Sequence, residues 1–254
     1  MDKSILVKIL GFPATLIHGC PGTLDRWLWL KKRLPKTLGR VNLLDIGCGS
    51  GAYTIGFALK GYSCLGISSS SEKNKTARER ANICKAHNAR FEFQDIAKLD
   101  DRQEFIGMFD VIICMEVIEH IFDDQGLMNH IGAFLKKGGR LFLSTAYYNQ
   151  ARTGPKPPID LFQKGGGHLR WGYDEAGLRA LSDRAGLEVE EISFCYGFLS
   201  RKLTVLHSWI AEKNEKLAWV IILPLRIIPP LLDRIVTNAL KRDWYSICLV
   251  ARKP

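Results

Sequence analysis

The sequence predicts a doubly wound α/β fold with a mostly parallel, seven-stranded sheet. From residue 41 onward, short apolar runs alternate with segments of helical periodicity, as in proteins built from repeated strand-helix units. One run, MFDVIICME, is almost continuously apolar, which is typical of a strand buried on both faces. With 254 residues, of which 46% are hydrophobic, the chain is long enough to bury one large core.

Strands and helices are expected in the alternating order that this fold requires. Gly61 is expected to close the first helix of the core, and Ser71 is the expected N-cap of the next one. Strands are expected at residues 41–47, 62–68, 91–96, 108–116, 140–148, 187–198 and 244–253. Helices are expected at residues 49–61, 71–87 and 174–186, with a further one that ends at Lys136-Lys137-Gly138-Gly139.

Changes in composition divide the chain into three regions. Residues 1–40 mix apolar and basic positions and predict an N-terminal helical cap. Residues 41–198 and 244–254 form the expected α/β core. Residues 199–243 form an apolar and basic helical insertion before the last strand.

A glycine-rich turn, Asp45-Ile-Gly-Cys-Gly-Ser-Gly51, follows the first expected strand, where an open α/β sheet places its ligand crevice. Its three glycines allow the backbone to turn sharply and to approach a ligand closely. The turn lacks the last glycine of the dinucleotide spacing G-x-G-x-x-G, and no G-K-[ST] follows it. It is therefore neither a typical dinucleotide-binding turn nor a phosphate loop.

Three segments in order resemble the motifs of one family. LLDIGCGSGAYTIGFA resembles the first motif of class I, Rossmann-like S-adenosylmethionine-dependent methyltransferases, and FDVIICMEVIEHI and LKKGGRLFLSTAYYN resemble the motifs at the fourth and fifth strands. The resemblance covers roughly residues 40–190 and implies S-adenosylmethionine as the cofactor. The segment E-x-x-E-H also resembles that of ubiquinone-pathway O-methyltransferases and of small-RNA 2′-O-methyltransferases.

The resemblance also implies where the cofactor binds. The glycine turn would hold its methionine end, and the residue after the third strand would contact the adenine amino group. The second strand departs from the family pattern, because it ends in Ser68 and not in the acidic residue that accepts both ribose hydroxyls. Either Ser68 or Glu72 is expected to make that contact. The expected cofactor-binding residues are Asp45, Gly47, Cys48, Gly49, Ser68, Asp95, Ile96 and Met115.

The acceptor site is expected at the same edge of the sheet. Methyl transfer from a sulfonium depends mainly on positioning, but an oxygen acceptor benefits from a general base. His120 and His168 are the candidate bases, and Glu116 lies at the tip of the fourth strand as a further catalytic candidate. The expected acceptor-binding residues, at the end of the fifth strand, are Tyr147, Tyr148 and Asn149.

The same segment offers an alternative site for a divalent metal. If it is helical, Glu116, Glu119 and His120 share a face, and His168 would complete a set of ligands. Because E-x-x-E-H also occurs in relatives that use no metal, the expectation is a site without one, with the cation as the alternative.

The net charge of +10 is concentrated at the C-terminal end, where residues 201–254 hold ten basic and four acidic residues. The insertion is too short in its apolar runs to cross a membrane, and Pro224 and Arg226 interrupt it. It suits peripheral membrane contact, a roof over a lipophilic pocket, or packing in a homodimer. The scattered cysteines fit a cytoplasmic protein.

The sequence thus predicts a methyltransferase acting on a small-molecule acceptor, at an oxygen of a phenolic, quinol, sugar or lipophilic compound. No DNA partner is expected, because the signature Asp/Asn-Pro-Pro-Tyr is missing after the fourth strand. The alternatives are an RNA ribose 2′-O-methyltransferase and a noncatalytic cofactor-binding partner protein.

Overall fold

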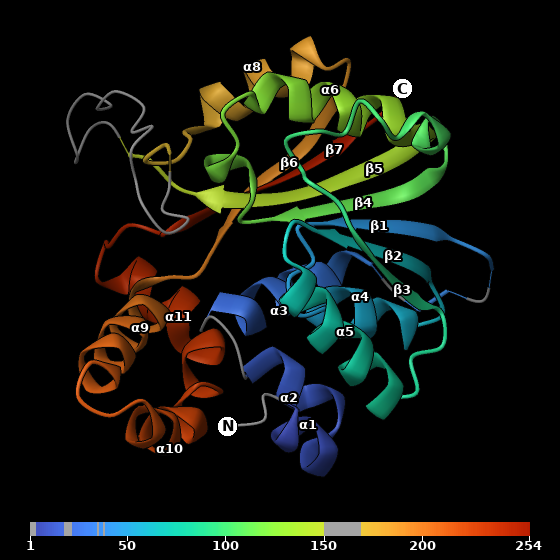
Figure 1. The fold of residues 1–254 in the computed structure, drawn as a ribbon. Helices are drawn as coiled ribbons and strands as arrows, with labels where there is room; N and C mark the ends of the chain where they lie inside the picture. The colour runs from blue at the N-terminus through green and yellow to red at the C-terminus, as the bar shows by residue number, and fades with distance from the viewer. Residues whose placement is uncertain (1–3, 18–21, 35, 38, 150–168) are drawn as a thin grey trace.

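The computed structural model describes residues 4–17, 22–34, 36–37, 39–149 and 169–254. Its strands form one seven-stranded sheet in the order β3-β2-β1-β4-β5-β7-β6 (Figure 1). Neighbouring strands pair in parallel except at β7, which runs antiparallel to both β5 and β6. The prediction of a mostly parallel, seven-stranded sheet is confirmed. The strands are β1 (Asn42–Ile46), β2 (Ser63–Ser68), β3 (Ala89–Phe93), β4 (Phe109–Met115), β5 (Leu135–Ala146), β6 (Glu188–Cys195) and β7 (Ser246–Arg252).

Helices cover both faces of the sheet, which makes the fold doubly wound. Figure 1 shows α6 and α8 on one face and α3, α4 and α5 on the other, with α9, α10 and α11 grouped beside the sheet. The helices are α1 (Ile5–Leu10), α2 (Phe12–Ile17), α3 (Gly22–Arg33), α4 (Ala52–Ala58), α5 (Ser71–Ile83), α6 (Asp124–Phe134), α8 (Glu175–Arg184), α9 (Phe198–Ala211), α10 (Glu215–Leu225) and α11 (Ile228–Ala239), with short 3₁₀ turns η1 (Gln103–Phe105) and η2 (Ile118–His120).

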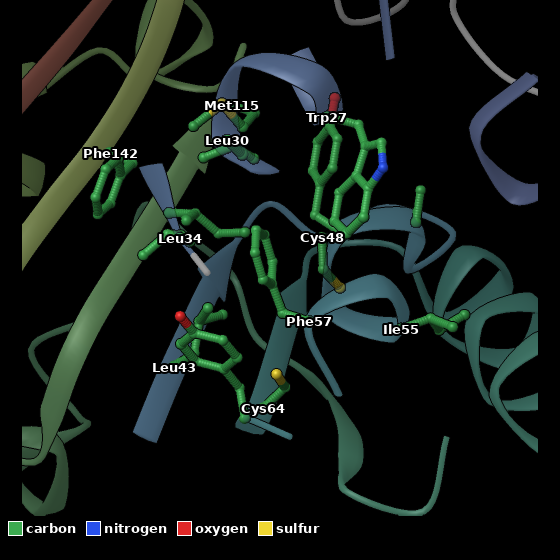
Figure 2. Close-up of a cluster of buried hydrophobic side chains, with 14 of the residues drawn as sticks. Trp27, Leu30, Leu34, Leu43, Cys48, Ile55, Phe57, Cys64, Met115 and Phe142 are labelled. Atoms are coloured by element: carbon green, nitrogen blue, oxygen red, sulfur yellow. The ribbon is translucent and has the colours of Figure 1, made fainter. Parts of the chain in front are cut away.

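Helix α3, in the N-terminal region, is packed into the core. The ring of Trp27 lies 5.0 Å from that of Phe57 in α4, and Trp29 lies 6.0 Å from Phe142 in β5. Figure 2 shows Trp27, Phe57 and Phe142 within one apolar cluster between these helices and the sheet. Helix α3 is therefore fixed against the sheet.

Several element boundaries differ from the prediction, and two of them have a clear physical reason. The N-cap of α5 is Ser70, whose Oγ accepts a hydrogen bond from the backbone N of Lys73 at 3.3 Å, whereas Ser71 already belongs to the helix. The run 136–139 was expected to end a helix, but β5 already begins at Leu135. The backbone N of Gly138 donates to the carbonyl of Lys253 at 2.8 Å, so pairing beyond β7 draws this run into the strand.

The topology brings two turns to the same edge of the sheet. β1 pairs with β2 on one side and with β4 on the other. The order of the strands in the sheet therefore changes direction between β1 and β4. Ile46 at the end of β1 lies opposite Cys114 near the end of β4, and Met115 lies opposite Ser144 in β5. Ligands of open α/β sheets bind at this kind of switch point.

Within the described ranges, no helix is long and apolar enough to span a bilayer.

Candidate active site

The turn after β1 is held in a conformation that glycine favours. Gly47, Gly49 and Gly51 have φ angles of 77°, 53° and 82°, in the left-handed region where a side chain is strained. The backbone N atoms of Gly47 and Cys48 both donate to the carbonyl of Ile67 at 2.9 and 3.0 Å. The turn is thereby tied to the end of β2.

The three glycines serve different purposes. A Cβ on Gly47 would lie 2.3 Å from Cγ2 of Val117, and one on Gly51 would lie 2.8 Å from the ring of Phe91, so both are required by packing. A Cβ on Gly49 would meet nothing closer than the Gly47 carbonyl oxygen at 4.0 Å. The backbone at Gly49 thus faces open space. That space fits the close approach of a ligand such as the methionine end of S-adenosylmethionine.

Asp45, the second-last residue of β1, carries a buried carboxyl group, with 1% of its surface exposed. Thr54 Oγ1 in α4 donates to its Oδ2 at 2.6 Å. Burial raises the pKa of Asp45 to about 7, and the hydrogen bonds from Thr54 oppose that shift. In the protein alone, Asp45 links β1 to α4. Its contact with the cofactor stays a prediction, as does that of Cys48, whose thiol is also buried.

The ends of β2 and β3 form the expected adenosine side. Ser68 is buried, and its Oγ accepts from the backbone N of Ser70 at 3.3 Å. Asp95 is half-buried, and its Oδ1 accepts from the backbone N of Ala97 at 3.1 Å. The next residue, Ile96, is buried, and its backbone N donates to Ser69 Oγ at 3.2 Å.

These residues lie at or just after the ends of the neighbouring parallel strands β2 and β3. Met115, at the end of β4, is buried like Ile96. Glu72 lies exposed in the first turn of α5. Whether Ser68 or Glu72 binds the ribose remains a prediction.

Glu116, directly after β4, is the most strongly connected residue of the site. Its φ of 55° is unusual for a residue other than glycine. Arg26 Nη2, from α3, lies 2.9 Å from its Oε2, and Ser144 Oγ donates to its Oε1 at 2.9 Å. Ser246 Oγ, at the start of β7, also donates to Oε1, at 3.3 Å. The carboxylate is thus held by three elements that are distant in sequence.

Glu119 is fully buried and has different neighbours. Thr145 Oγ1 donates to its Oε2 at 2.9 Å. Burial, together with the nearby carboxylate of Glu116, raises the pKa of Glu119 well above its ordinary range. Its carboxyl group therefore favours the protonated form, unlike an exposed glutamate.

The segment around Glu119 is not an α-helix. Residues 118–120 form a single 3₁₀ turn, so the helical face that the metal alternative required for Glu116, Glu119 and His120 is absent. Among the described residues, no three His, Cys, Asp or Glu side chains are grouped to hold a metal ion. His168 lies outside the described residues, so the four-residue metal set remains an untested alternative. His120 is half-buried at this edge.

The residues after β5 are tied to the C-terminal part of the chain. Tyr147 stacks edge-on against Phe194, with ring centres 4.9 Å apart, and Asn149 Nδ2 donates to Asp243 Oδ1 at 3.0 Å. Tyr148 is buried. The structure gives Tyr147 and Asn149 contacts within the protein, and their role toward an acceptor stays a prediction.

Sequence reasoning missed Arg26, Ser144 and Thr145. Arg26 lies in a stretch that mixes basic and apolar residues, where no spacing distinguishes it from Lys31 or Arg33. Ser144 and Thr145 follow an apolar run in β5. The change from apolar to polar residues there was the available signal in the sequence.

Comparison with known proteins agrees with this geometry. The family described as "Methyltransferase domain" matches residues 22–192. The ubiquinone biosynthesis O-methyltransferase of Xanthomonas euvesicatoria pv. vesicatoria (strain 85-10) is 31% identical over 161 residues, which are 61% of this chain and 66% of that protein. The match thus spans slightly less than two thirds of that relative.

Solved structures share the fold over most of the chain. The [4+2]-cyclase SpnF aligns with a TM-score of 0.64 at 20% identity, over 91% of this chain and 81% of its own. Magnesium protoporphyrin IX methyltransferase from Synechocystis PCC 6803 with bound S-adenosylhomocysteine aligns with a TM-score of 0.55 at 19% identity, over 92% and 82%. The chain therefore belongs to the methyltransferase-domain family, as an S-adenosylmethionine-dependent methyltransferase with the seven-stranded, Rossmann-like fold.

Proposed function

We propose that this methyltransferase transfers the methyl group of S-adenosylmethionine to an oxygen of a small, lipophilic acceptor of the phenol or quinol type. The observation that carries the proposal is the similarity, at about 30% identity, to enzymes named ubiquinone biosynthesis O-methyltransferase. The fold itself supports only the class of protein, because one fold hosts many reactions. The identity of the acceptor therefore rests on the relatives and on the chemistry of the site.

The reaction is a displacement at a methyl carbon, in which the acceptor oxygen attacks as the bond from carbon to sulfur breaks. The bound cofactor supplies the activated methyl group. The protein has to hold the two reactants in line and exclude water. Gly49, beside open space, allows the backbone to approach the cofactor, and β4 and β5 end at the same edge of the sheet.

An attacking phenol or quinol has to lose a proton. His120 is the described residue of this edge best suited to accept it, since histidine is the side chain that most often serves as a general base. Glu116, fixed by Arg26 and Ser144, would accept a hydrogen bond from the acceptor or orient it. Glu119 is fully buried and its pKa is raised, so it is not a candidate for the base.

The experiment is a transfer assay with isotope-labelled S-adenosylmethionine and a panel of catechols and hydroquinones with and without prenyl chains. The proposal expects labelled methoxy products, formed fastest with the prenylated members. The His120→Ala variant should lower kcat by about 100-fold or more, the usual contribution of a general base. His130→Ala is the matched control, because His130 lies in α6 next to Asp100.

Two outcomes would overturn the proposal. One is transfer to nitrogen or carbon acceptors but to none of the oxygen acceptors. The other is preference for an RNA ribose hydroxyl, tested in the same assay with short RNA duplexes. A parallel reaction with a chelator tests the metal alternative, since unchanged turnover would remove it.

A further inference from the structure

Helix α11 is amphipathic, but it exposes its apolar face and buries its polar face, which is the opposite of a helix in a water-soluble domain. Its apolar residues Leu231 and Ile235 are 68% and 67% exposed, and Ile228 and Leu232 on the same face are exposed as well. Positions i, i+3, i+4 and i+7 share one face of a helix, so these four form a continuous stripe. An exposed apolar stripe of this length is typical of a binding surface.

The opposite face of α11 is polar and buried. Asp233 is 3% exposed, and its carboxylate accepts from the backbone N atoms of Gly197, Leu199 and Ser200 at 3.0, 2.6 and 3.0 Å. Thr237 is fully buried and accepts from the backbone N of Phe198 at 2.9 Å. These hydrogen bonds cap the N-terminus of α9 and fix the rotation of α11 about its axis. The apolar stripe therefore cannot turn inward without breaking the cap.

The neighbouring helices repeat the pattern. In α10 the exposed apolar residues again recur at helical spacing, while Ala218 and Ile222 on the other side are fully buried. In α9 an exposed tryptophan and two aliphatic residues lie on the outer side. The exposed apolar residues of α9 and α10 are Val205, Leu206, Trp209, Leu217, Val220, Ile221 and Leu225. Together with the stripe of α11, we call these residues the apolar surface.

The charges on the same segment are mostly basic. Among its described side chains, the exposed acidic one is Glu212, and that of Asp243 is half-buried. Two copies of the chain that met through this surface would bring like charges together, whereas an anionic surface would neutralise them. The exposed basic residues are Arg201, Lys202, Lys213, Arg234, Lys241 and Arg242.

A cavity behind α11 is lined by charged side chains of both signs and by aromatic rings. It measures about 840 Å³ and lies between α3, β6 and α11. Lys31, Lys32 and Arg234 line it together with Trp29 and Trp244, and its acidic lining residues are Asp25, Glu191 and Asp233. Cationic and aromatic groups thus lie next to the helix that carries the stripe, as at the headgroup level of a bilayer.

We propose that the apolar surface of α9, α10 and α11 binds the surface of an anionic phospholipid bilayer, with the aliphatic side chains among the acyl chains and the basic residues against the phosphates. Such binding is peripheral, because no described helix is long enough to cross the bilayer. It would place the enzyme where a lipophilic acceptor dissolves. Vesicle binding requires neither cofactor nor acceptor, so its test is independent of the proposed reaction.

The test is cosedimentation with vesicles of phosphatidylglycerol and phosphatidylcholine in equal parts, compared with phosphatidylcholine alone. Binding should be strong on the anionic vesicles at low salt and should weaken as salt is added. The double variant Leu231→Glu/Ile235→Glu should bind at least about tenfold more weakly, because two aliphatic side chains no longer enter the bilayer. The matched control is Ile106→Glu/Met108→Glu, which changes two exposed apolar residues remote from the insertion and should bind normally.

The proposal is overturned if the unaltered protein stays in solution with anionic vesicles at low salt, or if the Leu231/Ile235 variant binds as well as the unaltered protein. It is also overturned if ultracentrifugation shows a dimer, the Leu231/Ile235 substitutions dissociate that dimer, and vesicles do not compete with its formation. Circular dichroism checks that the variants are folded. If the α11 variant is not, Leu217→Glu/Val220→Glu on α10 provides the same comparison.

Discussion

Arg26 Nη2 in α3 lies 2.9 Å from Oε2 of Glu116 at the end of β4, and 95% of the arginine side chain is buried. The pair connects the N-terminal helix to the edge of the sheet where the reaction is expected. Ser246 Oγ accepts from the same guanidinium at 3.3 Å and donates to the same carboxylate. Helix α3 is therefore a structural part of the candidate active site.

Replacing Arg26 should destabilise the protein. Arg26→Met leaves the carboxylate of Glu116 without its cation, and breaking a buried pair in this way costs about 3 kcal/mol. Urea unfolding measures the loss. A double-mutant cycle with Glu116→Gln should show coupling, because the second change removes the uncompensated charge. Strictly additive losses would contradict the pairing.

Adding a methyl group at Gly49 should affect binding more than folding. Gly49→Ala strains a left-handed residue by about 1 kcal/mol but clashes with no protein atom. Gly107→Ala introduces the same kind of strain away from the turn and serves as the control. Calorimetry should show S-adenosylmethionine binding weakened at least about tenfold in Gly49→Ala alone, because the new methyl group occupies the space that the cofactor needs. Equal affinities in both variants would refute the role of Gly49.

Asp45 should make the protein less stable as the pH rises. Its pKa is about 7 in the folded protein, against about 3.9 for an unperturbed aspartate, so the folded state binds more protons between these values. Its stabilising effect is complete below about pH 4 and is lost as the pH rises to about 7. The Asp45→Asn variant, which cannot ionise, should show a flatter profile in thermal melts across this window.

A slope will remain in that variant, since burial also raises the pKa of Asp25 to about 7. The exposed Asp100→Asn change provides the control. Parallel profiles for Asp45→Asn and the unaltered protein would show that Asp45 does not titrate as expected.

The cap formed by Asp233 should hold α9 and α11 together. Asp233→Asn has a single carbonyl oxygen in place of two and loses at least one of the hydrogen bonds to the start of α9. A lost cap costs about 1 kcal/mol. Hydrogen exchange should become faster in α9, and the exposed neighbour change Arg234→Gln should leave it unaltered. Unchanged protection of Leu199 and Ser200 would contradict the capping role.

The central fold followed directly from the sequence, because buried parallel strands and glycine turns depend on local composition. VNLLDIG, MFDVIICME and the glycine spacing each correspond to elements that the structure contains. Two of the boundary errors, at Ser71 and at residues 136–139, have different causes. The first is the choice between adjacent serines, and the second is pairing with Lys253, more than 100 residues away.

The site was less predictable. Glu116 could be selected from its place after a buried strand, but its partner Arg26 lies 90 positions earlier and belongs to a helix with several basic residues. The outward orientation of the apolar face of α11 could not be predicted either. A sequence pattern shows that a helix has an apolar face but does not show which way that face points. The hydrogen bonds from the start of α9 to Asp233 and Thr237 decide that direction.

Transfer to oxygen is measured by a single turnover from methyl-labelled S-adenosylmethionine to a prenylated catechol, with the product analysed by mass spectrometry. We expect a methoxy product and S-adenosylhomocysteine in equal amounts, both lost when Gly49 is replaced by valine. Binding of the cofactor with no transfer to any oxygen acceptor, or recovery of the label on nitrogen or carbon, would contradict that expectation.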